Sequence, residues 1–442
     1  MAEPGDPIER PSQSAALRAW LYVALNSFGG PAGQIAVMHR ELVERRRWLS
    51  DRAFLHALNY CMLLPGPEAQ QLATYIGWRL NGLRGGLTAG LLFILPGVVA
   101  IMALSVLYAL YEATVFVQAL FYGIKPAVVA LIIAAVFALA RRVLAGRSAW
   151  LIAGAAFVAI YLFDVAFPLI IAGAALAGWL ADRLAQRRAG AAEPEPAAGT
   201  PIERPAARRG LAVLVVAVVA WVGLPLLLVT ALGPASVFGQ LALFFSIAAL
   251  VTFGGAYAVL AFVAQQAVVG FGWLSAEQML DGLGLAESTP GPLIMVVQFV
   301  GFMAAFGAAG TLDPLVAGVL GALVVTWVTF VPSIGLVLAG APYVEYLGGR
   351  PRLNAALRGV TAAVVGVILN LGLWFGLQTL FGTTGELRIG VLRLHTVELG
   401  TLDLVALGLA GLALVLLRRR WPLLLTLALS AALGFGYRLL VA

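Results

Sequence analysis

Long apolar stretches separated by short polar connections fill most of the chain. Nine of them have the composition and approximate length of membrane crossings, the third being rather short: 86–111, 115–140, 148–162, 165–184, 211–232, 311–340, 353–381, 401–417 and 421–441. A transmembrane helix needs about 20 predominantly apolar residues. The pattern therefore predicts an all-α polytopic membrane protein.

Shorter apolar pieces precede these crossings in each half, and glycine and proline interrupt them. The pieces are 15–27, 32–46, 53–64 and 68–80, then 236–252, 256–270, 276–288 and 292–305. At 1.5 Å per residue, an arm of about 12 or 13 residues reaches only about 20 Å, short of the hydrocarbon core of about 30 Å. We therefore predict two re-entrant helical hairpins in each half, which enter the membrane and return to the same side.

The interrupted segments occur twice. Three blocks recur at one offset of 225 positions: Phe28-Gly29-Gly30 returns as Phe253-Gly254-Gly255, Trp48-Leu49-Ser50 as Trp273-Leu274-Ser275, and Pro65-Gly66-Pro67 as Pro290-Gly291-Pro292. Three blocks at one constant offset indicate a duplication. Paired interrupted segments at matching places in two halves are the best sequence pointer to the binding site of a transporter.

The duplication and the composition divide the chain into five parts. These are a polar tail (1–14), a first transporter repeat (15–184), a linker rich in Arg, Glu, Pro and Ala (185–210), a connecting transmembrane helix (211–232) and a second transporter repeat (233–442). The linker composition is typical of a disordered segment. The connecting helix has no counterpart in the first repeat.

Composition supports a membrane protein and excludes other classes. The 442 residues are 62% hydrophobic and 11% charged, whereas soluble domains are about 25% charged. The net charge of +7 comes from arginines beside apolar stretches, so it indicates membrane topology rather than nucleic-acid binding. Cys61 is the only cysteine and the three histidines lack ligand spacing. We therefore expect no disulfide, no metal site and no cofactor.

The distribution of arginine predicts that the two repeats have opposite orientations. Arginines flank the interrupted segments of the first repeat, whereas residues 210–349 contain no Lys or Arg. Cytoplasmic loops carry an excess of these residues, so the connection at Trp48 is predicted to be cytoplasmic and its counterpart at Trp273 external. The N-terminus and the linker are then cytoplasmic and the C-terminus is external. The predicted fold is two inverted-topology repeats, with 382–400 as a long external loop.

In a pair of inverted repeats the four interruptions converge near the membrane midplane. A new helix is predicted after each interruption, at Ala32, Glu68, Ala256 and Leu293. Unpaired N–H groups and the positive ends of the helix dipoles would then face the centre, which suits a multivalent anion. The alternative is that the interruptions are packing kinks, since Gly and Pro are common in membrane helices.

The candidate substrate-binding residues form the interruptions or offer hydrogen-bond donors beside them. They are Asn26, Ser27, Gly29, Gly30, Pro65, Gly66, Pro67 and Gln71 in the first repeat, and Thr252, Gly254, Gly255, Thr289, Pro290, Gly291 and Pro292 in the second.

Four charged residues inside or beside apolar stretches are further candidates. Lys125, the only lysine, lies about eleven residues into 115–140, and Arg358 lies in the matching crossing of the second repeat. An intramembrane cation is by default a hypothesis for a substrate site; the alternatives are snorkelling or a structural pair with a carboxylate such as Glu68. Glu68 and Glu287 stand beside the interruptions and are proton-coupling candidates, although Glu68 also fits a helix cap.

The longer motifs identify a family. The first repeat carries Phe28-Gly29-Gly30-Pro31, Arg46-Arg47-Trp48-Leu49-Ser50, Leu64-Pro65-Gly66-Pro67, Tyr75-Ile76-Gly77 and Leu95-Pro96-Gly97, and the second carries Phe253-Gly254-Gly255, Gly272-Trp273-Leu274-Ser275, Thr289-Pro290-Gly291-Pro292 and Phe330-Val331-Pro332-Ser333. Over roughly residues 15–380 the chain resembles the chromate ion transporter family in its long, two-domain members. The second repeat departs from the first in three ways. Gly30-Pro31 becomes Gly255-Ala256, and Pro96-Gly97 becomes Pro332-Ser333, displaced by an eleven-residue insertion near Thr311. Glu68-Ala69-Gln70-Gln71 becomes Leu293-Ile294-Met295-Val296, so the first repeat supplies more polar groups.

The resemblance implies export of chromate, a divalent tetrahedral oxyanion, from the cytoplasm across the bacterial inner membrane. It further implies that the proton motive force drives export and that sulfate, an isosteric divalent oxyanion, competes. The implied partners are such an oxyanion and the lipid bilayer, with no nucleic acid. The resemblance does not decide whether the protein forms a homodimer.

Other classes of function are alternatives to proton-driven chromate export. One is a transporter of sulfate or another anion. A second is a passive anion channel, which would share the site but need no titratable coupling group, so the dependence of flux on a proton gradient separates the two. A membrane-embedded enzyme is disfavoured, because the chain has one cysteine and no recognisable nucleotide motif.

Overall fold

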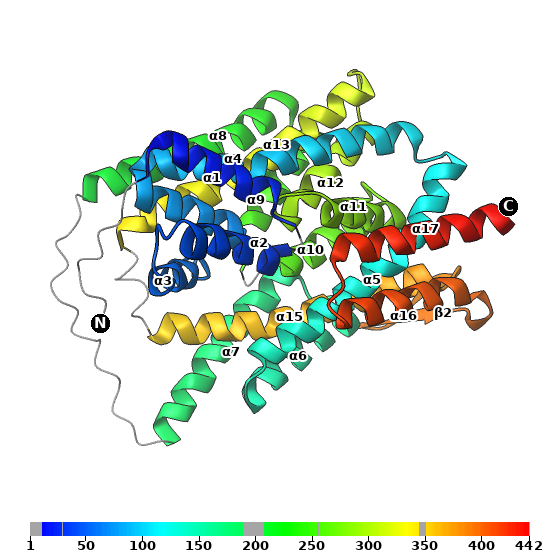
Figure 1. The fold of residues 1–442 in the computed structure, drawn as a ribbon. Helices are drawn as coiled ribbons and strands as arrows, with labels where there is room; N and C mark the ends of the chain where they lie inside the picture. Colours follow the sequence, from blue (N-terminus) through cyan, green and yellow to red (C-terminus); the bar gives the residue numbers. More distant parts are fainter. Residues whose placement is uncertain (1–10, 29, 189–206, 254–255, 344–350, 442) are drawn as a thin grey trace.

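The structure is a computed structural model that describes residues 11–28, 30–188, 207–253, 256–343 and 351–441. Figure 1 shows that most of the long helices run in roughly the same direction, while the helix of residues 167–188 is steeply tilted from it. The helices of the first half are α1 (Gln13–Leu25), α2 (Gly30–His39), α3 (Asp51–Cys61), α4 (Glu68–Tyr111), α5 (Val115–Val143), α6 (Arg147–Phe163) and α7 (Phe167–Arg188). The connecting helix is α8 (Ala207–Leu232).

The second half continues the same helical architecture. Its helices are α9 (Val237–Leu250), α10 (Ala256–Gln265), α11 (Ala276–Ser288), α12 (Val296–Gly307), α13 (Pro314–Gly340), α15 (Pro351–Leu380), α16 (Leu404–Arg418) and α17 (Leu423–Val441). Among the described residues, seven helices are long and apolar enough to cross a membrane. The all-α polytopic fold is therefore confirmed.

All nine predicted crossings fall on helices. Two of them, α6 with 17 residues and α16 with 15, are shorter than the usual spanning length. The predicted hairpin arm 68–80 and the predicted crossing 86–111 both lie in α4. The helix has a kink between them, at Asn81 and Gly82, where the backbone angles leave the helical range. The re-entrant path of the short helices and the inverted orientation of the halves stay predictions.

The short helices of the two halves match one another in order and position. Helices α1, α2 and α3 correspond to α9, α10 and α11, and the start of α4 corresponds to the 3₁₀ turn Leu293–Met295 followed by α12. Helix α2 ends in a π-helical turn, Arg40–Arg45, and α10 ends in another, Gln266–Gly270. Because a π-turn is rare, its recurrence at matching places supports the duplication.

Serine caps set the starts of two matching helices. Ser50 accepts a hydrogen bond from the Ala53 N–H at the start of α3, and Ser275 accepts one from the Gln278 N–H at the start of α11. Both are the serine of the repeated Trp-Leu-Ser block. A serine cap stabilises a helix start by about 1 kcal/mol, so this block fixes where each helix begins.

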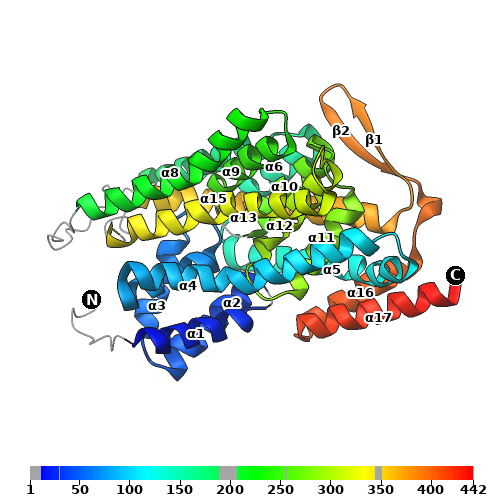
Figure 2. The same cartoon turned by 90° about the horizontal axis from the view of Figure 1, so that it is seen from above.

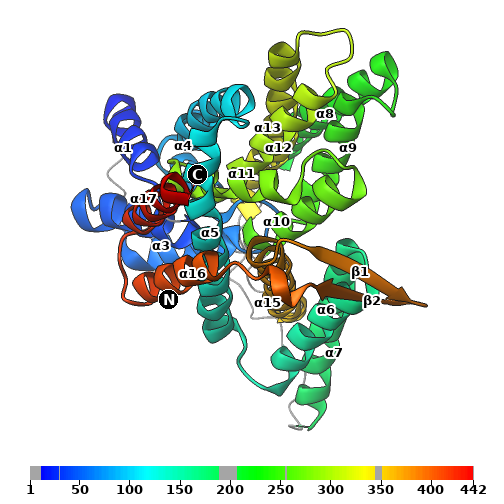
Figure 3. The same ribbon diagram turned by 90° about the vertical axis from the view of Figure 1, so that its right-hand side faces the viewer.

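Viewed along the helices, the molecule has three groups around a centre (Figure 3). Helices α5 and α11 lie near the middle. Helices α1, α3 and α4 lie on one side, α8, α9, α12 and α13 on a second, and α6, α7 and α15 on a third. Helix α15 packs against α5, α6 and α7, while α13 packs against both α4 and α12. The centre is therefore built from both halves.

A small sheet lies outside the helical body. Strands β1 (Thr384–Ile389) and β2 (Leu392–Val397) form an antiparallel hairpin with Arg388 opposite Arg393, and Figure 2 shows it extending from the helices. The sequence suggested only a long loop here, although Leu387, Ile389 and their polar neighbours alternate as in a strand. Buried Arg393 holds the hairpin: its Nη1 lies 3.0 Å from Asp164 Oδ1 and its Nη2 donates to the Ile160 carbonyl at 3.2 Å.

We expect Arg393→Ala to loosen this hairpin without unfolding the helices. The variant removes the ion pair with Asp164 and the bond to the Ile160 carbonyl, a loss of about 1–3 kcal/mol for contacts of a buried charged group. Limited proteolysis should then cut within 382–400 faster, with an unchanged melting temperature for the helical body. Arg388→Ala is the matched control, because Arg388 is exposed and its carboxylates lie 3.8 and 3.9 Å away. Equal protection of both variants would contradict the anchoring role.

Candidate functional site

Each Pro-Gly-Pro interruption forms a backbone hydrogen bond with the other half of the chain. The Gly66 N–H donates to the Thr252 carbonyl at 2.8 Å, and the Gly291 N–H donates to the Ser27 carbonyl at 2.9 Å. Residues 66 and 291 are 225 positions apart, as are 27 and 252. Reciprocal contacts of this kind are the mark of a two-fold arrangement. The duplicated interruptions therefore meet through a matched pair of hydrogen bonds.

The backbone at these interruptions has the same conformation in both halves. The Ser27 hydroxyl donates to the Val23 carbonyl and the Thr252 hydroxyl to the Ala248 carbonyl, each at 2.6 Å. Such bonds to the preceding turn satisfy the hydroxyl inside the protein. Gly66 has φ of +132° and Gly291 has φ of +108°. Glycine is required there, because side chains rarely tolerate these angles.

Each interruption packs against a proline-containing helix of the other half. A Cβ atom at Gly66 would lie 2.6 Å from the Ser333 Oγ atom, in α13. A Cβ atom at Gly291 would lie 3.2 Å from the Gly97 Cα atom, in α4. Gly97 follows Pro96 and Ser333 follows Pro332, so the motifs aligned in the sequence occupy equivalent places. A Cβ atom at Gly66 would therefore force the Ser333 side chain to shift, and one at Gly291 would make a tight contact with the Gly97 backbone.

Buried amide side chains surround the interruptions. Gln34 in α2 donates from Nε2 to the Gly291 carbonyl at 2.6 Å, and Gln71 in α4 donates from Nε2 to the Pro65 carbonyl at 2.7 Å. Gln70 accepts a hydrogen bond at Oε1 from the Ser333 hydroxyl at 2.8 Å. All three amides are essentially inaccessible to solvent. The Gln71 Oε1 atom has no hydrogen-bond partner among the described residues.

Sequence reasoning named Gln71 but missed three of these residues. Gln34, Gln70 and Ser333 were not among the candidates, although Gln70 stands next to Gln71 and Ser333 lies in one of the motifs that identified the family. Their signal was a polar side chain in an otherwise apolar helix next to an interruption. The structure pairs Ser27 with Gly291, and Gly66 with Thr252 and the neighbouring Gln71. Asn26 instead bonds the Tyr22 carbonyl at 2.8 Å and is exposed, and Thr289 bonds the Ala286 carbonyl at 3.1 Å.

The helix starts agree closely with the predicted ones. Helix α4 begins at the predicted Glu68 and the 3₁₀ turn at the predicted Leu293; among the described residues, α10 is helical from Ala256 and α2 is helical from Gly30, two residues before the predicted Ala32. The N–H groups of Gly66 and Gly291 are not free, because they bond across the halves. Gly29, Gly254 and Gly255 lie outside the described residues. An anion at this place would therefore use the N–H groups at the helix starts rather than those two glycine amides.

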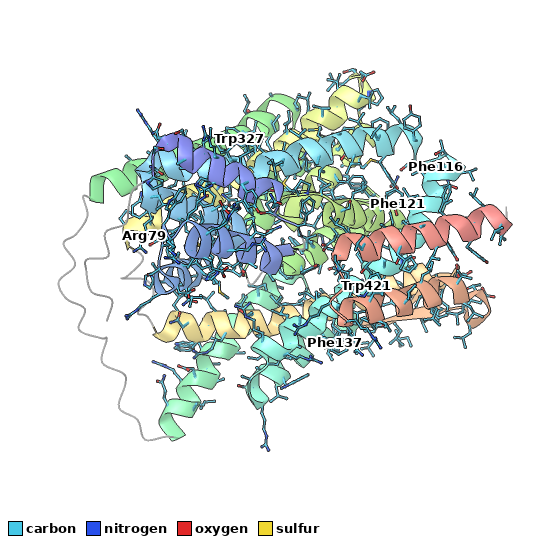
Figure 4. All side chains as sticks on the ribbon, in the orientation of Figure 1. Arg79, Phe116, Phe121, Phe137, Trp327 and Trp421 are labelled. Carbon is cyan, nitrogen blue, oxygen red and sulfur yellow. The ribbon has the colours of Figure 1, made fainter. Side chains whose placement is uncertain are left out.

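Two cavities lie at opposite ends of helix α5. Cavity 1, of about 1000 Å³, is lined by His56, Arg142, Asp182, Arg358 and the pair Met62 and Leu63, among others. Cavity 2, of about 760 Å³, is lined near the start of α5 by Phe121, Lys125, Glu277, Asp281 and others. Figure 4 shows Phe121 at the same end of the molecule as Phe116, away from Phe137. Met62 and Leu63, which line cavity 1, directly precede Leu64 and Pro65, where the first interruption begins.

The two candidate cations lie in different cavities, and both pair with carboxylates. Lys125 Nζ donates to Glu277 Oε2 at 2.7 Å and lies 3.8 Å from Asp281 Oδ1 in cavity 2. Arg358 Nη2 donates to Asp182 Oδ1 at 2.7 Å in cavity 1. The carboxylates that face Lys125 are therefore in the second half, and Glu68 is not among them. Neither cation touches the interruptions through an ion pair or hydrogen bond in the described chain.

The two candidate carboxylates have different surroundings. Glu68 is the first residue of α4 and is half-buried, and the Arg142 guanidinium interacts with it electrostatically. Glu287 is buried and accepts a hydrogen bond from the Tyr257 hydroxyl at 2.7 Å. The position of Glu287 in the first half is occupied by Met62. The carboxylate next to the second interruption is thus specific to that half.

These features define a multi-pass membrane protein in which two matching halves meet at their interruptions. Residues 15–179 and 239–435 match the family described as chromate transporter, and these ranges cover most of both halves. The chain belongs to the chromate transporter family. The family suggested by the repeated motifs is confirmed.

Relatives of known name agree with this assignment. The chain is 36% identical over 355 residues to the chromate transport protein of Pseudomonas aeruginosa, covering 79% of this chain and 77% of that protein. It is 31% identical over 369 residues to the probable chromate transport protein of Synechococcus elongatus, covering 80% and 82%. It is 30% identical over 348 residues to the chromate transport protein of Cupriavidus metallidurans, covering 77% of each. No solved structure matches the chain.

Proposed function

We propose that this protein exports chromate from the cytoplasm across the bacterial inner membrane, driven by protons that enter the cell. Membership of the chromate transporter family supports the substrate class. The observation that carries the proposal is the reciprocal pairing of the two interruptions, Gly66 with Thr252 and Gly291 with Ser27. The pairing supports an anion site at the starts of α4 and α2, because the helix dipoles there favour a divalent anion.

Cavity 1 is the proposed entrance for the anion. Arg142 and Arg358 outnumber Asp182 among its charged lining residues, and a cleft with an excess of one charge concentrates ions of the other sign. Its lining continues to Met62 and Leu63, directly before the first interruption. The arginines at this end predict a cytoplasmic location. The anion would thus approach the centre from the cytoplasm.

Flux through proteoliposomes tests the proposed function. Inside-out vesicles containing the purified protein should take up chromate, and acidifying their interior should accelerate uptake. Uptake that is equally fast without a pH gradient would instead indicate a passive anion channel. A protein that moves sulfate and is not inhibited by chromate would contradict the proposed substrate.

The inverted arrangement of the halves makes a separate prediction. Single cysteines at positions 48 and 273, in a Cys61→Ala background, should react with a membrane-impermeant thiol reagent from opposite sides. Position 48 should react from the cytoplasm and position 273 from outside, because arginine flanks only the first. The background variant without either cysteine is the control. Labelling of both positions from one side would contradict the inverted repeats.

A further inference from the structure

Cavity 2 contains a buried carboxylate that the anion site does not use. Asp281 is 5% exposed, and its Oδ2 atom accepts a hydrogen bond from the Tyr108 hydroxyl at 2.8 Å. Its Oδ1 atom has no hydrogen-bond partner among the described residues, and Lys125 Nζ lies 3.8 Å away from it. Buried carboxylates are costly unless fully paired. One carboxylate oxygen of Asp281 therefore lacks a hydrogen-bond donor, and this residue lies at the wall of a polar cavity.

The groups around Asp281 come from three helices. Lys125 faces it from α5, Tyr108 from α4, Glu112 from the position directly after α4, and Glu277 from its own helix, α11. Glu112 accepts hydrogen bonds from Gln278 Nε2 at 3.2 and 3.1 Å. Asp403 and Arg438 also line cavity 2, so its charged lining residues are four carboxylates and two cations, an excess of negative charge that attracts a positive ion.

The two cavities differ in charge at matching positions. The counterpart of Asp281, 225 residues earlier, is His56. His56 and Arg358 line cavity 1, whereas Asp281 and Lys125 line cavity 2. Cavity 1 therefore has two basic residues at these positions, whereas cavity 2 has one acidic and one basic residue. Cavity 1 suits an anion, and cavity 2 suits a positively charged partner.

We propose that Asp281 is the proton-binding site of the transporter, and that protons reach it through cavity 2. This inference rests on the proposed function, because it supplies the coupling ion for anion export. A proton fits better than a metal cation, since a metal ion would have to share the site with the Lys125 ammonium group. A proton instead bonds to the Asp281 carboxylate and neutralises it, leaving Lys125 paired with Glu277 alone.

Helix α11 connects Asp281 to the anion site. It runs from Ala276 to Ser288, and Asp281 lies about 10 Å along it from the end. The ion pair with Lys125 and the bond from Tyr108 tie α11 to α5 and α4. Neutralising Asp281 weakens the tie to Lys125. The helix then moves more freely, and with it Gly291, which binds the Ser27 carbonyl and the Gln34 amide.

Infrared difference spectroscopy of the purified full-length protein tests proton binding without any substrate. Lowering the pH should produce a carboxylic-acid C=O band that is present in the native protein and in Glu277→Gln but missing in Asp281→Asn. Glu277→Gln is the matched control, because it removes a carboxylate from the same cavity at a side chain that is 74% exposed. A band that persists in Asp281→Asn would overturn the proposal.

Flux in proteoliposomes tests coupling. Each coupled proton allows about a tenfold accumulation ratio per pH unit, and Asp281→Asn should lose this gradient-driven accumulation more than it loses chromate exchange at equal pH. Glu277→Gln should keep gradient-driven accumulation. Native-like accumulation by Asp281→Asn, or native transport driven by a sodium gradient in place of a proton gradient, would overturn the proposal. If the native protein moves no chromate, the proposed function fails and the infrared band alone decides whether Asp281 binds a proton.

Discussion

Replacing Gly66 or Gly291 by leucine is expected to abolish chromate transport while leaving membrane insertion intact. Both glycines have backbone angles that side chains rarely adopt, which costs about 1–3 kcal/mol. A Cβ atom at Gly66 would also lie 2.6 Å from the Ser333 Oγ atom, and overpacking of this kind costs about 1–3 kcal/mol. The change would push the two halves apart where they pair. Chromate uptake by vesicles that contain equal amounts of each variant measures the effect.

Gly154→Leu is the matched control for these variants. Gly154 lies in α6, is exposed, and has open space where a Cβ atom would stand. It should insert and transport like the native protein. Size-exclusion profiles in detergent separate loss of transport from loss of folding. Full chromate uptake by well-folded Gly66→Leu and Gly291→Leu proteins would contradict a site at the interruptions.

Replacing Lys125 by methionine is expected to lower the yield of folded protein strongly. The change leaves the buried Asp281 carboxylate without its cation, and breaking a buried pair costs about 3–5 kcal/mol. The double variant Lys125→Met with Asp281→Asn removes both charges and should restore most of the yield. Lys125→Arg keeps the charge but changes the geometry, so it should be intermediate. Thermal unfolding followed by fluorescence in detergent measures the four proteins.

A role of Lys125 in attracting substrate makes the opposite forecast. In that case Lys125→Met would fold normally and bind chromate weakly, and Asp281→Asn would not rescue it. The contacts with Glu277 and Asp281 support the structural role. Unchanged chromate affinity in a well-folded Lys125→Met protein would exclude the substrate role, whereas a well-folded variant with a large loss of affinity would exclude the structural one.

The positions of the helices could be predicted from the sequence because the membrane makes their pattern simple. Every crossing is a long apolar stretch, and each interruption is marked by Gly and Pro, which end helices locally. Helix α4 agrees with this reasoning, because its two predicted pieces, 68–80 and 86–111, meet at a kink where the backbone angles of Asn81 and Gly82 leave the helical range. The hairpin β1–β2 was missed because one short alternating segment gives a weak signal in an apolar chain.

The identity of the interruptions was predictable, but the partners that meet there were not. A constant offset of 225 positions identified Gly66 and Gly291 as equivalent. It did not show that their N–H groups bond to Thr252 and Ser27, because packing between the halves decides this. The partners of Lys125 were likewise unpredictable. Glu277 and Asp281 lie 152 and 156 positions away in the sequence, and only the tertiary fold brings α11 against α5.

Locating chromium in the protein tests the proposed anion site most directly. Crystals of the full-length protein grown with chromate should give one anomalous difference peak between the two interruptions, within hydrogen-bonding distance of the first N–H groups of α4 or α2. The Gly66→Leu variant should lose this peak. A chromium peak that appears only in cavity 1 or cavity 2, with none between the interruptions, would contradict the anion site proposed for this protein.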